Sequence, residues 1–117
     1  LRRALRLLDA HTGALGTHAF ESDRGMPQNV PASRFLRPCA GRLAPFHPAH
    51  IATIKRGMTK AARAGKGYHL WWHPHNFGVD TDTNMAGLRE IVSHYVRLKE
   101  ETGQISVAMQ DEGSLAA

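Results

Sequence analysis

The sequence predicts an α/β fold that holds only part of a parallel sheet. Segments with helical periodicity flank a short aromatic run between Gly67 and Pro74, and a second apolar alternation at 105–109 follows the last helix. A strand, a helix and a strand in this order are typical of a parallel pair with a right-handed crossover. Two parallel strands cannot bury both faces within 117 residues, so we expect a portion of a larger barrel or sheet.

The chain opens on the pattern of an amphipathic helix, with arginines between the apolar positions. The apolar positions recur at helical spacing, namely Leu1, Ala4, Leu5 and Leu8. Gly13 can adopt the left-handed conformation that ends such a helix. Because the chain starts with Leu1 and no capping residue precedes it, we expect the natural amino-terminal part to be missing.

Residues 14–47 carry four prolines and three glycines, which exclude a long helix or strand. We expect a functional loop region there. Cys39 is the only cysteine, so the chain can form neither an internal disulfide nor a cysteine-based zinc site. We expect its thiol to be buried and unreactive.

A second helix is expected to begin near Pro48 and to end at Gly65 and Gly67. One side of it is basic, and the opposite side carries the apolar stripe Ile51, Ile54, Met58, Ala61 and Ala62. A third helix is expected over about 84–101, started by Asp82, Thr83 or Asn84 and followed by Gly103. Its predicted apolar face is Met85, Leu88, Ile91, Val92, Tyr95 and Leu98. The segment 105–109 is expected to be a short strand.

The aromatic run 68–73 is predicted to be a strand, because it is bounded by glycine and by Pro74. Side chains alternate along a strand, so one face is expected to carry His69, Trp71 and His73. His73 would stand at the carboxyl end, where catalytic groups gather in parallel α/β folds. His75 and Asn76 follow on the same rim. A tryptophan ring on which a sugar can stack, together with a side-chain amide that can orient it, is typical of a sugar-binding site.

Three histidines within seven residues also raise the question of a metal site. His69 and His73 would lie roughly 13 Å apart along a strand, too far to share an ion. His73 and His75 could converge across Pro74, but no third protein ligand is evident. We therefore expect this segment alone to hold no metal.

The amino-acid composition excludes few functional classes of protein. The chain is 42% hydrophobic and 21% charged, with a formal charge of +5 and a sequence pI of about 10.0. No apolar run approaches the roughly 18 residues of a membrane span, and no signal peptide opens the chain. The local basic cluster at 55–66 is typical of a solvated helix face.

The string His69 to Gly78, H-L-W-W-H-P-H-N-F-G, resembles the last motif of polysaccharide deacetylase-like (NodB-homology) proteins, particularly those associated with bacterial surface polysaccharides. Residues 33–38 and 56–58, Asn84 with Leu88, and residues 103–109 are also similar to that family, so the likeness covers about residues 30–110. The resemblance implies a partial distorted (β/α) barrel, represented by its C-terminal helix-strand-helix-strand portion. Residues 1–117 would then be the C-terminal part of a single domain.

The resemblance implies a carbohydrate deacetylase that hydrolyses acetyl amides or esters on a bacterial surface polysaccharide or its precursor. A divalent metal, zinc by expectation, would be held by an Asp and two His of earlier motifs, and an early Asp would act as base. His73 would be the catalytic acid that protonates the departing nitrogen or oxygen. The expected substrate-binding residues are Trp71, His75, Asn76 and Arg37.

The early Asp-Asp motif is absent from this sequence, and the one His-x-x-x-His spacing, His69 with His73, belongs to the last motif itself and not to an earlier metal-binding segment. Asp80 and Asp82 follow the histidine motif, so neither is assigned as base or ligand. The fragment alone is thus expected to bind no metal and to be inactive.

Two alternatives stay open. One is a metal-dependent amidohydrolase of another class, which would use His73 and His75 as a ligand pair. The other is a basic nucleic-acid-binding module in which Tyr68, Trp71 and Trp72 stack on bases. The aromatic and basic residues lie on separate elements and no nucleic-acid motif occurs, so we expect a carbohydrate partner and no nucleic acid. The compartment, cytoplasm or cell envelope, and the oligomeric state stay open.

Overall fold

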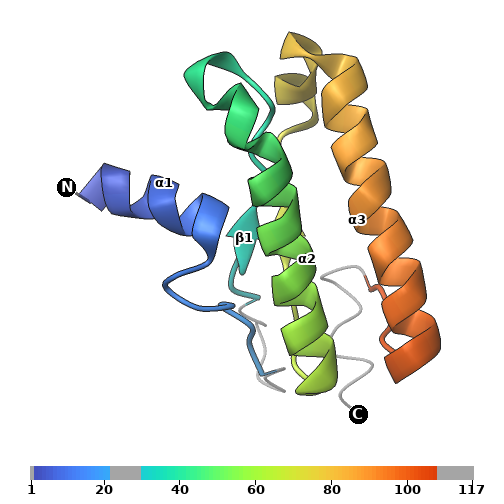
Figure 1. Cartoon of the computed structure of the whole chain (residues 1–117). Coiled ribbons are helices and arrows are strands. Elements are labelled where there is room, and N and C mark those ends of the chain that lie inside the picture. The colour runs from blue at the N-terminus through green and yellow to red at the C-terminus, as the bar shows by residue number, and fades with distance from the viewer. Residues whose placement is uncertain (1, 22–29, 108–117) are drawn as a thin grey trace.

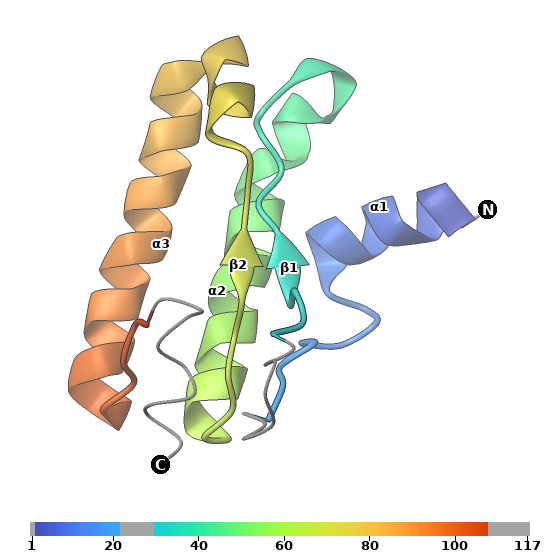
Figure 2. The same cartoon turned by 180° about the vertical axis from the view of Figure 1, so that it is seen from behind.

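The computed structural model describes residues 2–21 and 30–107, and these form an α/β arrangement of two layers. The elements in chain order are α1 (Arg2–Thr12), β1 (Arg34–Phe35), the 3-10 helix η1 (Gly41–Phe46), α2 (His47–Arg63), β2 (Leu70–Trp71), the 3-10 helix η2 (Pro74–Val79) and α3 (Thr81–Thr102). Helices α2 and α3 lie side by side along one face of the strands, and α1 projects from the β1 side (Figures 1 and 2).

Helix α1 ends where the sequence predicts, because Gly13 adopts a φ of 68° and its N–H donates to the Asp9 carbonyl at 2.7 Å. Its apolar side is largely uncovered by the described part of the chain, since Leu5 is 46% and Leu8 60% exposed. Only Ala10 of this helix is buried. The carboxyl-terminal turn of α1, rather than its leucine stripe, therefore joins the core.

The two strands are parallel, with Arg34 opposite Leu70 and Phe35 opposite Trp71. This pairing corrects the prediction that the aromatic strand pairs with 105–109. Residues 105–107 form no strand, and 108–109 lie outside the described residues. The strand-helix-strand unit is therefore β1–α2–β2, and its first strand comes from the predicted loop region, where Pro31 and Pro38 leave room for only a short ladder.

Helix α2 has the predicted limits and orientation. Pro48 occupies its first turn, Gly65 follows its end with a φ of 63°, and Ile51, Ile54, Met58 and Ala61 are buried. Gly57 is the point of closest approach to the sheet, because a Cβ there would stand 2.8 Å from Cε2 of Tyr68. Glycine thus lets the Tyr68 ring lie against the helix backbone.

Helix α3 begins three residues earlier than predicted. Asp80 caps it, since its Oδ1 accepts the Thr83 N–H at 3.2 Å, so the three expected caps lie inside the helix. Gly103 ends the helix with a φ of 74°, as predicted. The predicted apolar face is wrong at Val92, which is 51% exposed, while Ile91 and Leu98 are buried.

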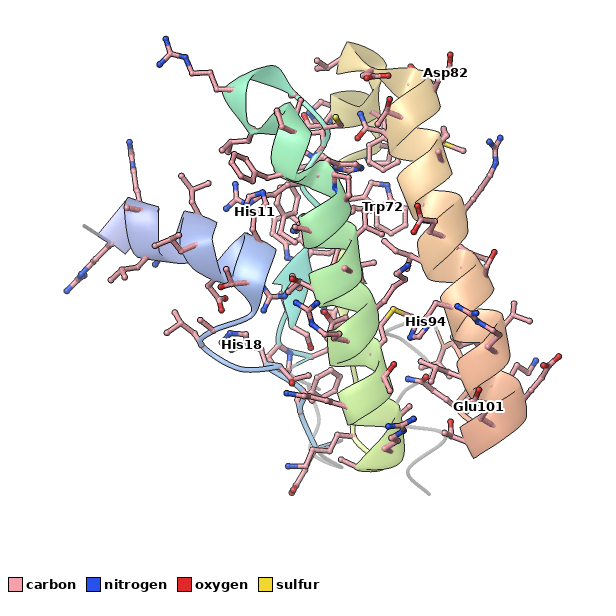
Figure 3. The ribbon with its side chains drawn as sticks, in the orientation of Figure 1. His11, His18, Trp72, Asp82, His94 and Glu101 are labelled. Atoms are coloured by element: carbon pink, nitrogen blue, oxygen red, sulfur yellow. The ribbon has the colours of Figure 1, made fainter. Side chains whose placement is uncertain are left out.

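The hydrophobic core lies between the helices and one face of the sheet. Its buried members are Leu36, Ile51, Ile54, Met58, Phe77, Ile91 and Leu98. Leu70 and Trp72 pack against this cluster, whereas Trp71 between them is exposed, which confirms the predicted alternation along the aromatic strand. Figure 3 shows Trp72 between α2 and α3, and Asp82 outside the core at the start of α3.

Within residues 2–21 and 30–107, no helix is both long enough and apolar enough to cross a membrane.

This packing predicts unequal costs for two aliphatic truncations on facing helices. Ile54 is 0% exposed, so Ile54→Ala should lower the free energy of unfolding by about 2–5 kcal/mol through lost burial and a cavity. Val92→Ala, at a half-exposed site, should change it by no more than about 0.5 kcal/mol. Urea unfolding followed by circular dichroism measures both, and equal losses would contradict the core described here.

Candidate functional site

The rim at the carboxyl ends of β1 and β2 gathers the residues that the sequence singled out. Because the strands are parallel, Arg37 after β1 and His73 after β2 leave the sheet at the same end. The ladder ends at Trp71, earlier than predicted, but His73 keeps an extended backbone with φ −103° and ψ 111°. Pro74 then starts η2, which carries His75 and Asn76 along the rim.

Four aromatic rings form a continuous row along this rim, which we call the ring row: Phe35, Trp71, His73 and His75. The ring centroids of Phe35 and Trp71 are 4.5 Å apart, and those of Trp71 and His73 are 5.2 Å apart at 89°. His73 and His75 stack at 5.4 Å with 30° between their planes. The structure therefore brings together three predicted site residues, Trp71, His73 and His75, and adds Phe35. Phe35 was not predicted, because it reaches Trp71 only through the pairing of two strands that are far apart in the sequence.

The ring row lies on the face of the sheet that α2 and α3 leave uncovered. Trp71 is 38% exposed, and His73 and His75 are also exposed. Phe35 is half-buried and contacts His73 as well, at 5.9 Å between ring centroids. An open apolar surface that ends in two imidazoles can stack a flat ligand and exchange a proton with it.

His69 does not belong to this row, although the alternation predicts the same face for it. Its Nδ1 is buried and has no hydrogen-bond partner among the described residues, and the residue lines a cavity of about 690 Å³ at the amino end of β2. Apolar side chains of α2 and α3, including Met58 and Ile91, line the same cavity. The cavity lies at the opposite end of the strand from the ring row, where parallel folds do not gather catalytic groups.

Arg37 is positioned through its backbone by a buried histidine. Its N–H donates to Nε2 of His50 at 3.0 Å, and Nδ1 of His50 donates to the Ala10 carbonyl at 2.7 Å. Both ring nitrogens are therefore engaged, and the imidazole must be neutral to accept from Arg37. Burial, with a smaller contribution from the neighbouring positive charge, lowers the pKa of His50 to about 4.

The two rim loops share a second anchor, Asn84 in the first turn of α3. Its side chain is 2% exposed, and its Oδ1 accepts the Cys39 N–H at 2.6 Å. Its Nδ2 donates to the Phe77 carbonyl at 3.5 Å. The loop after β1 and the loop after β2 are therefore tied to one amide. Sequence spacing predicts Asn84 only as a candidate helix cap, because it does not reveal that these two loops meet.

Asn76 lies on the same rim and is half-buried, with its N–H donating to the His73 carbonyl at 3.0 Å. This bond closes the turn that carries His75 back over His73. Cys39 is buried, as predicted, and its thiol faces the Ala44 carbonyl at 3.9 Å.

The described residues do not form a site for the divalent metal that the resemblance implies. They contain no group of three or more histidine, cysteine, aspartate or glutamate side chains close enough to hold an ion. His73 and His75 provide two imidazoles, and Asp80 is engaged as the cap of α3.

No protein-family model matches this chain, and neither a curated protein nor a solved structure matches it. The assignment of the candidate site therefore depends on the geometry of its own residues alone.

The low pKa of His50 predicts a pH-dependent stability. The unfolded chain takes up a proton near pH 6.5 and the folded chain only near pH 4, so stability is complete above pH 6.5 and falls toward pH 4. Between pH 6.5 and pH 4 this difference should lower the free energy of unfolding by about 3 kcal/mol.

His50→Gln should flatten this slope, because glutamine offers both hydrogen bonds without titrating. Urea unfolding from pH 4 to pH 7 compares the two proteins. Burial also lowers the pKa of His47, so a smaller slope should remain. An unchanged slope in His50→Gln would show that other groups carry the pH dependence.

Proposed function

We propose that this chain is the C-terminal part of a metal-dependent carbohydrate deacetylase with a distorted (β/α) barrel, and that His73 is its catalytic acid. One observation carries the proposal: His73 stands within a row of aromatic rings at the carboxyl ends of two parallel strands. This is the place in parallel α/β folds where substrates bind and react.

The ring row suits a sugar ring. Apolar faces of a pyranose stack on aromatic rings, and a few polar groups fix the orientation. Trp71 and Phe35 supply the apolar surface, while the flanking polar groups are those of Arg37, His75 and Asn76. The acetyl group of a bound sugar would then lie next to His73.

His73 fits the role of proton donor. An amine leaves an amide poorly unless its nitrogen is protonated, and histidine can donate a proton near neutral pH. The edge contact with Trp71 and the stack with His75 hold the imidazole in place while its ring stays exposed. The proton would pass from a ring nitrogen of His73 to the departing nitrogen, or to the departing oxygen of an ester.

The open edge of the sheet supports the barrel. Among the described strands, β2 is hydrogen-bonded to β1 only, so its other edge is one that a further strand could join. The apolar cavity beside β2 also offers room for further packing. We place the metal ligands and the catalytic base outside the described residues, and the metal would supply an activated water when bound.

The nucleic-acid alternative is less favoured by the arrangement of charge. The basic side of α2 faces away from the sheet, because its opposite side packs on the core, whereas Trp71 lies beyond the sheet. Lys55 is paired with Glu90 at 2.9 Å. A bound strand could not contact the ring row and the basic helix face together.

The proposal is tested by replacing His73 in the complete protein. His73→Ala should lower kcat for acetate release from an N-acetylated oligosaccharide by about 10²–10⁴-fold, with metal content unchanged by elemental analysis. His75→Ala is the matched control and should cost less, because His75 only frames the sugar. The loss should shrink on 4-nitrophenyl acetate, whose leaving group needs no proton.

The pH profile adds an independent readout. The limb of activity that falls with rising pH should vanish in His73→Ala, because an acid must be protonated to act. If His73→Ala instead strips the metal, and the activated ester restores nothing, His73 is a ligand and the amidohydrolase alternative takes the lead.

A further inference from the structure

A second, smaller cavity lies beside the ring row at the outer edge of β1. It has a volume of about 190 Å³ and is enclosed by the end of α1, the loop after β1, η1 and the start of α2. The residues that matter for its chemistry are His11, Phe35, Arg37, His47 and His50. Figure 3 shows His11 at the junction of α1 and α2.

The lining of this cavity favours an anion. It includes one arginine and three histidines and no carboxylate among the described residues. In that part of the chain, no hydrogen bond or ion pair engages the Arg37 guanidinium, so its donors are available. His11 binds the Leu7 carbonyl through Nδ1 at 2.7 Å, which leaves Nε2 for another partner.

The other two histidines, His47 and His50, line the cavity, and we assign them no contact with a ligand. Both nitrogens of His50 are engaged, with Ala10 and Arg37. Nε2 of His47 faces α3, since a Cβ at Gly87 would stand 2.9 Å from it. Arg37 and His11 are therefore the groups that can reach a ligand, and a planar guanidinium matches a planar carboxylate through two parallel hydrogen bonds.

Phe35 connects this cavity with the ring row. Its ring lines the cavity and also contacts Trp71 at 4.5 Å and His73 at 5.9 Å. A sugar stacked on Trp71 would thus place the next sugar of the polymer over Phe35 and its substituent at the cavity. A volume above the ~150 Å³ that accommodates benzene is enough for a carboxylate with the edge of its sugar ring.

We propose that this cavity is a carboxylate subsite, and that the substrate is an acidic polymer with a uronic acid next to the acetylated sugar. The inference rests on the proposed deacetylase function and names its substrate class. Arg37 binds the carboxylate, His11 supports it, and Phe35 separates this subsite from the reacting acetyl group.

Two matched tetrasaccharides test the proposal with the complete protein. One alternates N-acetylglucosamine with glucuronate, and the other is the neutral N-acetylglucosamine tetramer. Calorimetric titration should give tighter binding of the acidic tetramer, and Arg37→Gln should reduce that preference about tenfold or more. His11→Gln should reduce it less. Arg42→Gln, which removes a charge from an exposed site in η1 outside the cavity lining, should leave the preference unchanged.

Acetate release is measured on the same two tetramers, so that the two proposals can fail separately. Equal binding of both tetramers, or a preference that Arg42→Gln reduces as much as Arg37→Gln, would overturn the carboxylate subsite even if acetate is released from both. Selective, Arg37-dependent binding of the acidic tetramer without acetate release would keep the subsite and overturn the deacetylase. If neither tetramer binds, both proposals are wrong.

Discussion

The buried imidazole of His50 is the constraint on which the arrangement of the rim depends. It is 1% exposed, and it joins three elements: its own helix α2, the end of α1 through Ala10 and the loop after β1 through Arg37. Burial keeps the ring neutral, so one nitrogen can donate while the other accepts. The ion pair of Arg34 with Asp9, at 3.4 Å, adds a second tie between β1 and α1.

The spacing of apolar residues along the sequence was sufficient to predict the helices that pack on the core. It was not sufficient to predict the sheet. The stripe of α2 and its glycine end could be read directly, because local spacing decides which side is apolar. Strand β1 could not be found in this way, since two residues between prolines carry no periodicity and their partner lies 36 positions further along the chain. The apolar alternation at 105–109 predicted a strand that would pair with the aromatic run, but local alternation does not encode which strands pair.

The sequence predicted those parts of the candidate site that depend only on the alternation of side chains along one strand. Trp71, His73 and His75 meet as expected, whereas Phe35 joins them only through the register between distant segments. His69 was predicted to share a face with Trp71 and His73, but it lies at the amino end of β2 and lines a different cavity. Asn84 was placed correctly near the start of a helix, yet its contacts run to two loops that sequence spacing cannot bring together.

The double attachment of Asn84 has a mechanical consequence for the rim. The loop carrying Arg37 and the turn carrying His75 are fastened to the same first turn of α3, so neither can shift without straining the other. The distance between these two rim loops is thus fixed by the scaffold. Relatives with a different substrate would be expected to differ in the side chains that project from these loops, while keeping the loops themselves in register.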